Sequence, residues 1–221
     1  MAQFTLYSHG GGPNGHTVAF VLKALGLSYE TKYLDFGKGE QKSEEFLKLN
    51  KNGRIPALVD HQNGDYVVWE SKACMQYLVE KYDTERKLTV GQSAEEQGIL
   101  LQWLFFQASG QGPYFGQAAH FLMFAPEDVP YAKERYTKEV SRVLGVLESV
   151  LSKQEWLVGG KLTIADLSFI TWNNFALHAL LPKDVDANKE FPAVVAWHQK
   201  LLALPYVAEA LKEREEVMKQ Q

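Results

Sequence analysis

The chain reads RIPALVDHQNGDYVVWESKACMQYLVEKY at residues 54–82, and this stretch decides its fold. Two short β-prone runs, Ala57–Asp60 and Tyr66–Trp69, flank an Asn-Gly pair, which is a strong signal for a hairpin turn. A helix from about Ser71 to Tyr82 is expected to follow. The stretch therefore predicts an antiparallel hairpin with a helix directly after it.

Upstream of the hairpin, the sequence predicts a strand, a helix and a second strand. Gln3–Tyr7 is a β-prone run that ends at a glycine-rich loop, and apolar residues at helical spacing follow from Val18 to Leu25. Tyr29–Asp35 resembles a second strand, and a connection of this kind implies a parallel pair with a right-handed crossover. Residues 37–52 are polar and are expected to form a loop. The whole region predicts a four-stranded mixed sheet.

After Asp83 only helical periodicity remains. A helical stripe of apolar residues runs through Asp128–Lys153. Thr163 and Asp166 have the spacing of a capping box at the start of a helix. At 221 residues, the chain corresponds to about 1.5 average domains. We therefore expect a small α/β domain over residues 1–84 and an all-helical domain over 92–221.

Composition excludes several classes of protein. The chain is 46% hydrophobic with a net charge of −4, and the absence of a basic stripe argues against a nucleic-acid partner. No apolar run approaches the roughly 20 residues of a membrane span, and the N-terminus does not resemble a signal peptide, so we expect a cytoplasmic protein without a membrane partner. Cys74 is the single cysteine, and the histidines lack metal-binding spacing, so no metal is assigned.

The loop after the first strand could bind an anion. Gly10–Pro13 leads into the first helix, whose N-terminus offers N–H groups and a positive end suited to an anion or a thiolate. Asn14 could donate to such a group, or it could simply cap the helix. The glycines could equally serve only to make a sharp turn.

Two further motifs have both a binding and a structural interpretation. If Pro56 is cis, the N–H and C=O of Ile55 face outward and can pair with an extended peptide ligand; the alternative is an ordinary turn. At the next helix, Ser71 is either a cap or part of an N-terminus that holds a carboxylate. Glu70 could then take an ammonium group, or it could only complement the helix dipole. Together Glu70 and Ser71 suit an α-amino acid end.

Other candidates lie on the helices. Cys74 falls on the apolar side of its helix, which indicates a buried, inert thiol. The aromatic residues Phe106, Tyr114 and Phe115 belong to the core by default, but they could line a pocket for an apolar substrate. Glycines and a proline within residues 110–116 are expected to bend the long helix and open it there.

Taken together, these motifs resemble the glutathione transferase superfamily over nearly the full chain. The marks are Arg-Ile-Pro at 54–56, Glu-Ser at 70–71 and Leu-Thr-Ile-Ala-Asp at 162–166. Further matches are similar to the fungal transferases related to the yeast nitrogen-catabolite prion regulator, and the loop is also similar to the bacterial Nu class. These matches are Pro-Asn-Gly-His at 13–16, Leu-Asp-Phe at 34–36, Trp-Leu-Phe-Phe-Gln at 103–107 and Trp-Asn-Asn at 172–174.

The resemblance implies a thioredoxin-like N-terminal domain, an all-α C-terminal domain, a homodimer and glutathione as substrate. Glu70 and Ser71 would hold the γ-glutamyl end, and the backbone of Ile55 would pair with the cysteinyl part. The glycyl end would meet Gln41 and Arg54. Asn14 would face the sulfur as the catalytic polar group.

The chemistry implied by the resemblance is an attack by the thiolate of bound glutathione. A thiol pKa of about 8.5 would be lowered by the N–H groups of the first helix and by Asn14. Nu-class proteins often have a threonine where this chain has Gly12, and Tyr7 and Ser8 are the nearest hydroxyls. The missing hydroxyl disfavours conjugation of model aryl halides, and it favours peroxidase or disulfide reductase activity in detoxification or oxidative stress. A mechanism that uses a protein thiol is disfavoured, because the loop lacks cysteine.

Two alternatives belong to other functional classes. The chain could bind glutathione or a hydrophobic ligand as a non-catalytic regulator. A prion-type regulator is expected to carry an Asn- and Gln-rich tail, which this sequence does not show. A purely structural interaction module is disfavoured by the Glu70-Ser71 pair.

Overall fold

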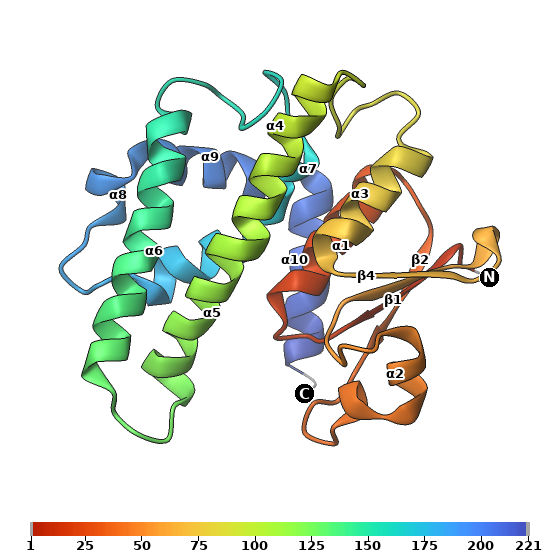
Figure 1. Ribbon diagram of the computed structural model, residues 1–221, viewed down its shortest axis with the longest axis horizontal. Helices are drawn as coiled ribbons and strands as arrows, with labels where there is room; N and C mark the ends of the chain where they lie inside the picture. The colour runs from red at the N-terminus through yellow and green to blue at the C-terminus, as the bar shows by residue number, and fades with distance from the viewer. Residues whose placement is uncertain (1, 220–221) are drawn as a thin grey trace. The chain divides into compact units, whose positions relative to one another are not determined.

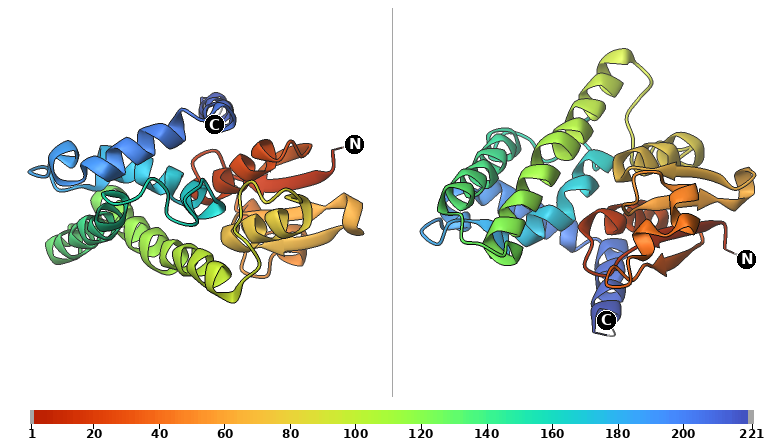
Figure 2. Two further views of the ribbon diagram at one scale, coloured as in Figure 1. Left: turned by 90° about the horizontal axis from the view of Figure 1, so that it is seen from above. Right: turned by 60° about the horizontal axis from the view of Figure 1, so that its bottom comes forward.

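The computed structural model describes residues 2–219, and the chain forms two compact units. One unit is Met1–Thr89 with Ala203–Gln221, and the other is Val90–Leu202. The sequence analysis instead grouped 92–221 into one helical domain. The difference arises because the last helix, α10 (Pro205–Met218), packs against helix α1 (Pro13–Ala24) of the first unit (Figure 2).

The first unit is built on the predicted four-stranded mixed sheet. Its strands stand in the order β2-β1-β3-β4, with β1 and β2 parallel and the other neighbouring pairs antiparallel. The second strand ends two positions earlier than expected, at Tyr33. The strands are β1 (Phe4–Ser8), β2 (Tyr29–Tyr33), β3 (Ala57–Asp60) and β4 (Tyr66–Trp69).

Helices cover both faces of this sheet. Helices α1 and α3 (Ser71–Tyr82) lie on one face and α2 (Glu44–Leu49) lies on the other (Figure 1). Phe4 and Leu6 of β1 are fully buried, and the alternation of a strand turns them to the same face. On the α2 face, Phe46 forms a core cluster with Leu34 and Ala57.

Helix α2 is not predicted from the sequence, because the polar stretch 37–52 indicates a loop. A short 3₁₀ helix, η1 (Glu40–Lys42), precedes α2. The Ser43 hydroxyl accepts a hydrogen bond from the Phe46 N–H at 3.2 Å and so caps α2. Burial of Phe46 at 3% exposure then holds this short helix against the sheet.

The second unit contains helices with three π-helical segments between or after them. The glycine-rich region 110–116 does not interrupt the helical backbone, which instead widens into π-helical turns on either side of α5. In chain order the elements are α4 (Ala94–Phe105), η3 (Phe106–Gln111), α5 (Gly112–Ala119), η4 (His120–Phe124), α6 (Pro130–Leu151), α7 (Ile164–Phe175), η5 (Ala176–Leu180), α8 (Ala187–Glu190) and α9 (Pro192–Leu202). Within the described residues, no helix is both long and apolar enough to cross a membrane.

The predicted capping box at the start of α7 is confirmed, and its carboxylate also ties other segments together. Asp166 accepts hydrogen bonds from the N–H and the hydroxyl of Thr163, at 2.9 and 3.0 Å. It also accepts from the Leu157 N–H at 3.0 Å and from the Trp197 indole at 3.2 Å. Burial raises the pKa of Asp166 to about 6, and the donors from Leu157 and Thr163 oppose that rise.

We predict that Asp166→Asn destabilises the protein by about 1–3 kcal/mol. The amide nitrogen of asparagine cannot accept a hydrogen bond, so buried donors lose their partner. Urea denaturation measures the change. Asp184→Asn on the surface is the control and is expected to change stability by less than about 0.5 kcal/mol. Equal stability of the two variants would contradict the role given to Asp166.

Candidate functional site

Three of the predicted motifs meet at one edge of the sheet in the first unit. Tyr7 of β1 pairs with Ala57 of β3, and Ala57 pairs with Trp69 of β4. The loop after β1, the residues before β3 and the residues after β4 therefore leave the sheet side by side. This register brings the loop Gly10–Pro13, the glycine loop, together with Ile55 and Glu70. A site for a single ligand requires such an arrangement.

The glycine loop packs closely on Ile55. A Cβ atom added to Gly12 would lie 2.9 Å from Cδ1 of Ile55, so only glycine fits here without a shift. The N–H groups of Gly12 and Gly11 donate to the carbonyl and to Nδ1 of His9, each at 3.0 Å. The His9 ring in turn stacks on Phe36 with centroids 4.1 Å apart. The loop is thus a folded turn with its own internal hydrogen bonds.

Helix α1 begins at Pro13, one residue before Asn14. The cap position is Gly12, and no side chain caps this helix. The structure therefore excludes the interpretation of Asn14 as an N-cap. Asn14 lies half-buried in the first turn, where the helix presents its positive end.

The two nearby hydroxyls lie on opposite faces of the sheet. Ser8 is 1% exposed and its hydroxyl faces helix α1, because a Cβ added to Gly15 would lie 2.0 Å from Ser8 Oγ. The Tyr7 ring packs on the opposite face of the sheet against Phe46, and Lys32 lies over it. The Ser8 hydroxyl therefore lies against Gly15, next to Asn14 in the chain, whereas the Tyr7 ring lies on the other face of the sheet.

The backbone before β3 is available to a ligand. The Ile55–Pro56 peptide bond is cis, as one of the two sequence interpretations required. Strand pairing begins only at Ala57, and no backbone hydrogen bond of Ile55 is found among the described residues. Its N–H and C=O can therefore pair with an extended ligand.

Glu70 and Ser71 lie at the N-terminus of α3. Glu70 occupies the cap position with φ of +69°, a conformation that is strained for a residue other than glycine, and its side chain is exposed. Ser71 is the first helical residue and is buried, so it does not cap the helix. Behind them, burial lowers the pKa of Lys72 to about 7 and raises that of Cys74. Cys74 is fully buried and is an inert core residue, as predicted.

Gln41 and Arg54 lie beside this edge. The carbonyl oxygen of Gln41 would be 2.9 Å from a Cβ added to Gly53, so the η1 turn packs on the residue before Arg54. The Arg54 side chain is exposed, and its backbone carbonyl accepts a hydrogen bond from the Asn50 amide at 2.6 Å. The Arg54 guanidinium is therefore accessible to a ligand bound at this edge of the sheet.

The aromatic candidates belong to the second unit. Phe115 is fully buried and packs edge-on against Trp172, so we assign it to the core and not to a substrate pocket. Phe106 and Tyr114 are half-buried. A chain of buried amides runs nearby, from Gln107 to Gln111 and on to Asn173.

The sequence analysis missed two residues that hold the glycine loop. Arg214 of α10 donates from Nε to the Gly10 carbonyl at 2.9 Å, and Nε2 of His16 lies 3.2 Å from the same oxygen. Nothing in the sequence marks Arg214, because it is one cation among many charges in the last helix. Within the part of the chain that the structure describes, no group of three His, Cys, Asp or Glu residues is placed to hold a metal ion.

Comparison with known families assigns the chain. The family profile for the glutathione S-transferase N-terminal domain matches residues 2–80, and that for the C-terminal domain matches residues 113–205. The chain belongs to the glutathione S-transferase family. This confirms the resemblance on which the site residues were assigned.

Several relatives of this glutathione S-transferase family member are fungal proteins. It is 49% identical to glutathione S-transferase 1 of Schizosaccharomyces pombe, over 99% of each chain. It is 59% identical to the glutathione transferase URE2P6 of Phanerochaete chrysosporium, solved with oxidised glutathione, with a TM-score of 0.95 over 98% of each chain. It is 41% identical to the nitrogen regulation fragment of the yeast prion protein Ure2p, with a TM-score of 0.89 over 96% of each chain. The fungal, Ure2-related group is therefore confirmed.

We predict that Gly15→Ala destabilises the protein by about 1–3 kcal/mol, because the added methyl group would collide with Ser8. In a Ser8→Gly background the same substitution is expected to be far milder. Urea denaturation of the four variants of this cycle measures the coupling. Gly145→Ala is the matched control: its added Cβ meets nothing within 4 Å in helix α6, so it should be stabilising. Equal effects of Gly15→Ala in both backgrounds would contradict the contact.

Proposed function

We propose that this chain is a cytoplasmic glutathione transferase that uses the thiolate of bound glutathione against a disulfide or a hydroperoxide. The observation that carries the proposal is the sheet edge. The first turn of α1, the unpaired backbone of Ile55 and the strained Glu70 converge there. This edge offers a positive helix end, an extended backbone and a carboxylate, which match the thiol, the peptide and the ammonium group of glutathione.

The γ-glutamyl end is assigned to the start of α3. The exposed Glu70 carboxylate accepts hydrogen bonds from the α-ammonium group, and the N–H groups of the first helical turn, from Ser71 onward, donate to the α-carboxylate. The strain at Glu70 supports this assignment, because such conformations persist where the surrounding structure holds a functional group in place.

The remaining parts of glutathione follow from this anchor. The cysteinyl N–H and C=O pair with Ile55, as a short β-bridge. The glycyl carboxylate meets the guanidinium of Arg54 and the amide of Gln41. The sulfur then reaches the first turn of α1, where the amide of Asn14 donates to it. Asn14 is the catalytic residue of this proposal.

The chemistry is a thiol–disulfide exchange. The positive end of α1 and the Asn14 amide favour the charged form of the sulfur, so they lower the thiol pKa. The thiolate attacks the glutathionyl sulfur of a mixed disulfide, oxidised glutathione forms, and the electron pair of the broken S–S bond leaves on the other sulfur as a thiolate. The presence of oxidised glutathione in the related URE2P6 structure supports this product. With a hydroperoxide, the thiolate attacks the terminal oxygen, the O–O bond breaks, alkoxide leaves and a sulfenic acid of glutathione forms; a second glutathione then displaces water from it to give oxidised glutathione.

We also propose that the chain acts as a homodimer in detoxification or in the response to oxidative stress, as the family resemblance implies. The second substrate is then a small hydrophobic electrophile, a peroxide or a disulfide. Light scattering of the purified protein tests the dimer.

A second candidate function is a regulator that binds glutathione or a hydrophobic ligand without turnover. The similarity to the nitrogen regulation fragment of Ure2p favours it. Retention on immobilised glutathione without turnover of any disulfide, hydroperoxide or aryl halide would support the regulator and contradict the enzyme.

We predict that Glu70→Gln weakens glutathione binding at least about tenfold, because the charge-assisted hydrogen bond to the ammonium group is lost. Isothermal titration calorimetry measures the dissociation constant. Glu80→Gln, an exposed carboxylate on the same helix, is the matched control and should leave binding unchanged. Equal affinity of the two variants would remove Glu70 from the site.

We predict that Asn14→Ala lowers kcat/KM for a glutathionyl mixed disulfide by about tenfold or more, with a smaller effect on glutathione binding. The reason is that the amide stabilises the thiolate rather than the peptide part of glutathione. The pH profile of kcat/KM should move to higher pH, since the thiol pKa rises. Asn188→Ala, on the exposed α8, serves as the control. Unchanged turnover of the Asn14 variant would remove this residue from the mechanism.

A further inference from the structure

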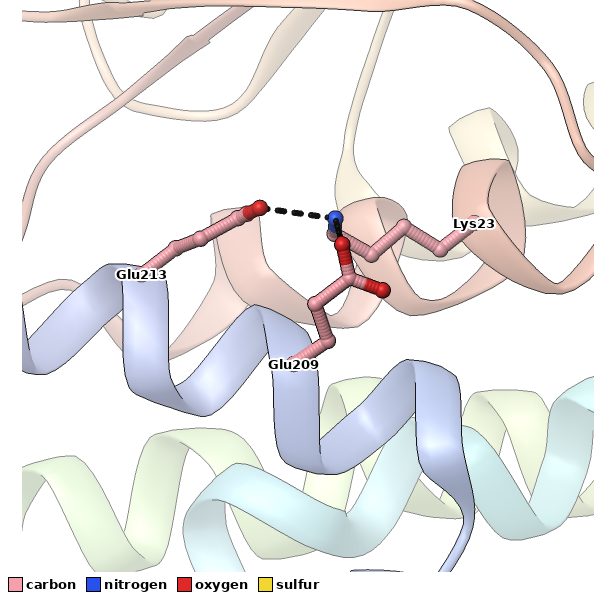
Figure 3. Close-up of polar contacts among 3 residues, drawn as sticks. All are labelled: Lys23, Glu209 and Glu213. Atoms are coloured by element: carbon pink, nitrogen blue, oxygen red, sulfur yellow. Dashed lines mark hydrogen bonds and ion pairs between the residues drawn. The ribbon is translucent and has the colours of Figure 1, made fainter.

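The C-terminal helix α10 is bonded to the C-terminal end of helix α1 and to the glycine loop that precedes α1. Near the end of α1, Lys23 donates to Glu209 and Glu213 of α10, at 2.9 and 2.8 Å (Figure 3). Burial alone would lower the pKa of Lys23, but the hydrogen bonds that it donates to Glu213 and Glu209 raise its pKa above the ordinary value. Lys23 therefore stays protonated between the two carboxylates.

At the other end of α1, the contact from α10 reaches the glycine loop instead of the helix. Arg214 donates from Nε to the Gly10 carbonyl at 2.9 Å and from Nη2 to the Gly11 carbonyl at 3.4 Å. Its side chain is half-buried; burial lowers its pKa, and the neighbouring Glu215 opposes that. A planar guanidinium can hold two carbonyl oxygens at once, which a lysine ammonium cannot do in the same geometry.

His16 completes the attachment from within α1. It is 3% exposed, and Nε2 lies 3.2 Å from the Gly10 carbonyl. Burial, and secondly the charge of Arg214, lowers the pKa of His16 to about 4. The imidazole is therefore neutral at neutral pH, and it can donate to the carbonyl without adding charge. The Arg214 guanidinium thus bonds the carbonyls of Gly10 and Gly11, and the neutral His16 ring lies against the Gly10 carbonyl.

We propose that Arg214 is a positioning residue for the thiolate site, an inference that rests on the proposed function. The carbonyl oxygens of Gly10 and Gly11 are the negative ends of their peptide dipoles. They lie directly before the N-terminus of α1, which is the positive end of that helix. A guanidinium on these oxygens offsets their charge and fixes the loop, so the first turn of α1 and Asn14 stay directed at the sulfur. Arg214 thereby lowers the thiol pKa of bound glutathione without contacting the ligand.

The titratable groups around the loop do not interfere with this readout. Burial lowers the pKa of His9, and Asp35 opposes that effect. The Asp35 carboxylate is paired with Lys38, which lowers its pKa. Both histidines of the loop region therefore have a pKa below the ordinary value. Lys72 of α3, by contrast, titrates near neutrality, because burial lowers its pKa to about 7, so the readout is the ultraviolet absorbance of the thiolate itself.

The test measures the thiol pKa of bound glutathione in Arg214→Ala, from the ultraviolet absorbance of the thiolate as a function of pH. We expect an increase of about 0.5–1 pKa unit, which lowers kcat/KM about three- to tenfold at a pH below the pKa. Calorimetry should show much less change in the affinity for glutathione. Arg214→Lys, which keeps the charge but loses the two-pronged contact, should give an intermediate thiol pKa. Any other order of the three pKa values contradicts the proposal.

The matched control is the double variant Glu209→Gln/Glu213→Gln. It loosens the attachment of α10 at Lys23 but leaves the glycine loop untouched, so the thiol pKa should stay that of the wild type. A shift equal to that of Arg214→Ala would show that general docking of α10 matters, and it would overturn the specific role of Arg214. Thermal unfolding confirms that each variant is folded. Failure of the wild type to bind glutathione would overturn the proposed function itself, whereas unchanged thiol pKa values overturn only the role of Arg214.

Discussion

The close approach of helix α1 to the end of strand β1 is the contact on which the site depends. Gly15 lies against Ser8 so tightly that an added Cβ would come within 2.0 Å of the serine oxygen. This contact sets where the helix begins relative to the sheet. The positive end of α1 is thereby held at the same edge as Ile55 and Glu70, and a shift of the helix would separate the three.

Many of the polar groups at this edge belong to the backbone. Two helix N-termini and the unpaired backbone of Ile55 lie at this edge, together with the side chains of Asn14 and Glu70, which we propose bind glutathione. Such groups are useful because secondary structure holds them fixed before a ligand arrives. The buried Cys74 and Lys72 lie behind this layer. A reactive sulfur at the edge therefore has to come from the ligand.

The predictions from sequence succeeded where a local pattern had one physical meaning. The Asn-Gly hairpin and the Thr163–Asp166 capping box depend on residues close in the chain, and both are confirmed. Helix α2 was missed because its burial depends on one side chain, Phe46, packing on a distant sheet. For Phe115 the sequence leaves both a core position and a pocket position open, because an aromatic residue in the core and one in a pocket have the same local pattern; its complete burial assigns it to the core.

By itself, the sequence determined the four-stranded mixed sheet, the all-helical character of the chain after it and the family, since these follow from periodicity, turn residues and motifs that local chemistry constrains. Only the tertiary structure decided that Asn14 is not a cap, that Ser8 and Tyr7 lie on opposite faces of the sheet, and that Arg214 in the last helix donates to the carbonyls of the glycine loop. The physical reason is the same in each case. The direction of a side chain and its distant partner are set by how helices pack on the sheet, and no spacing along the chain records that packing.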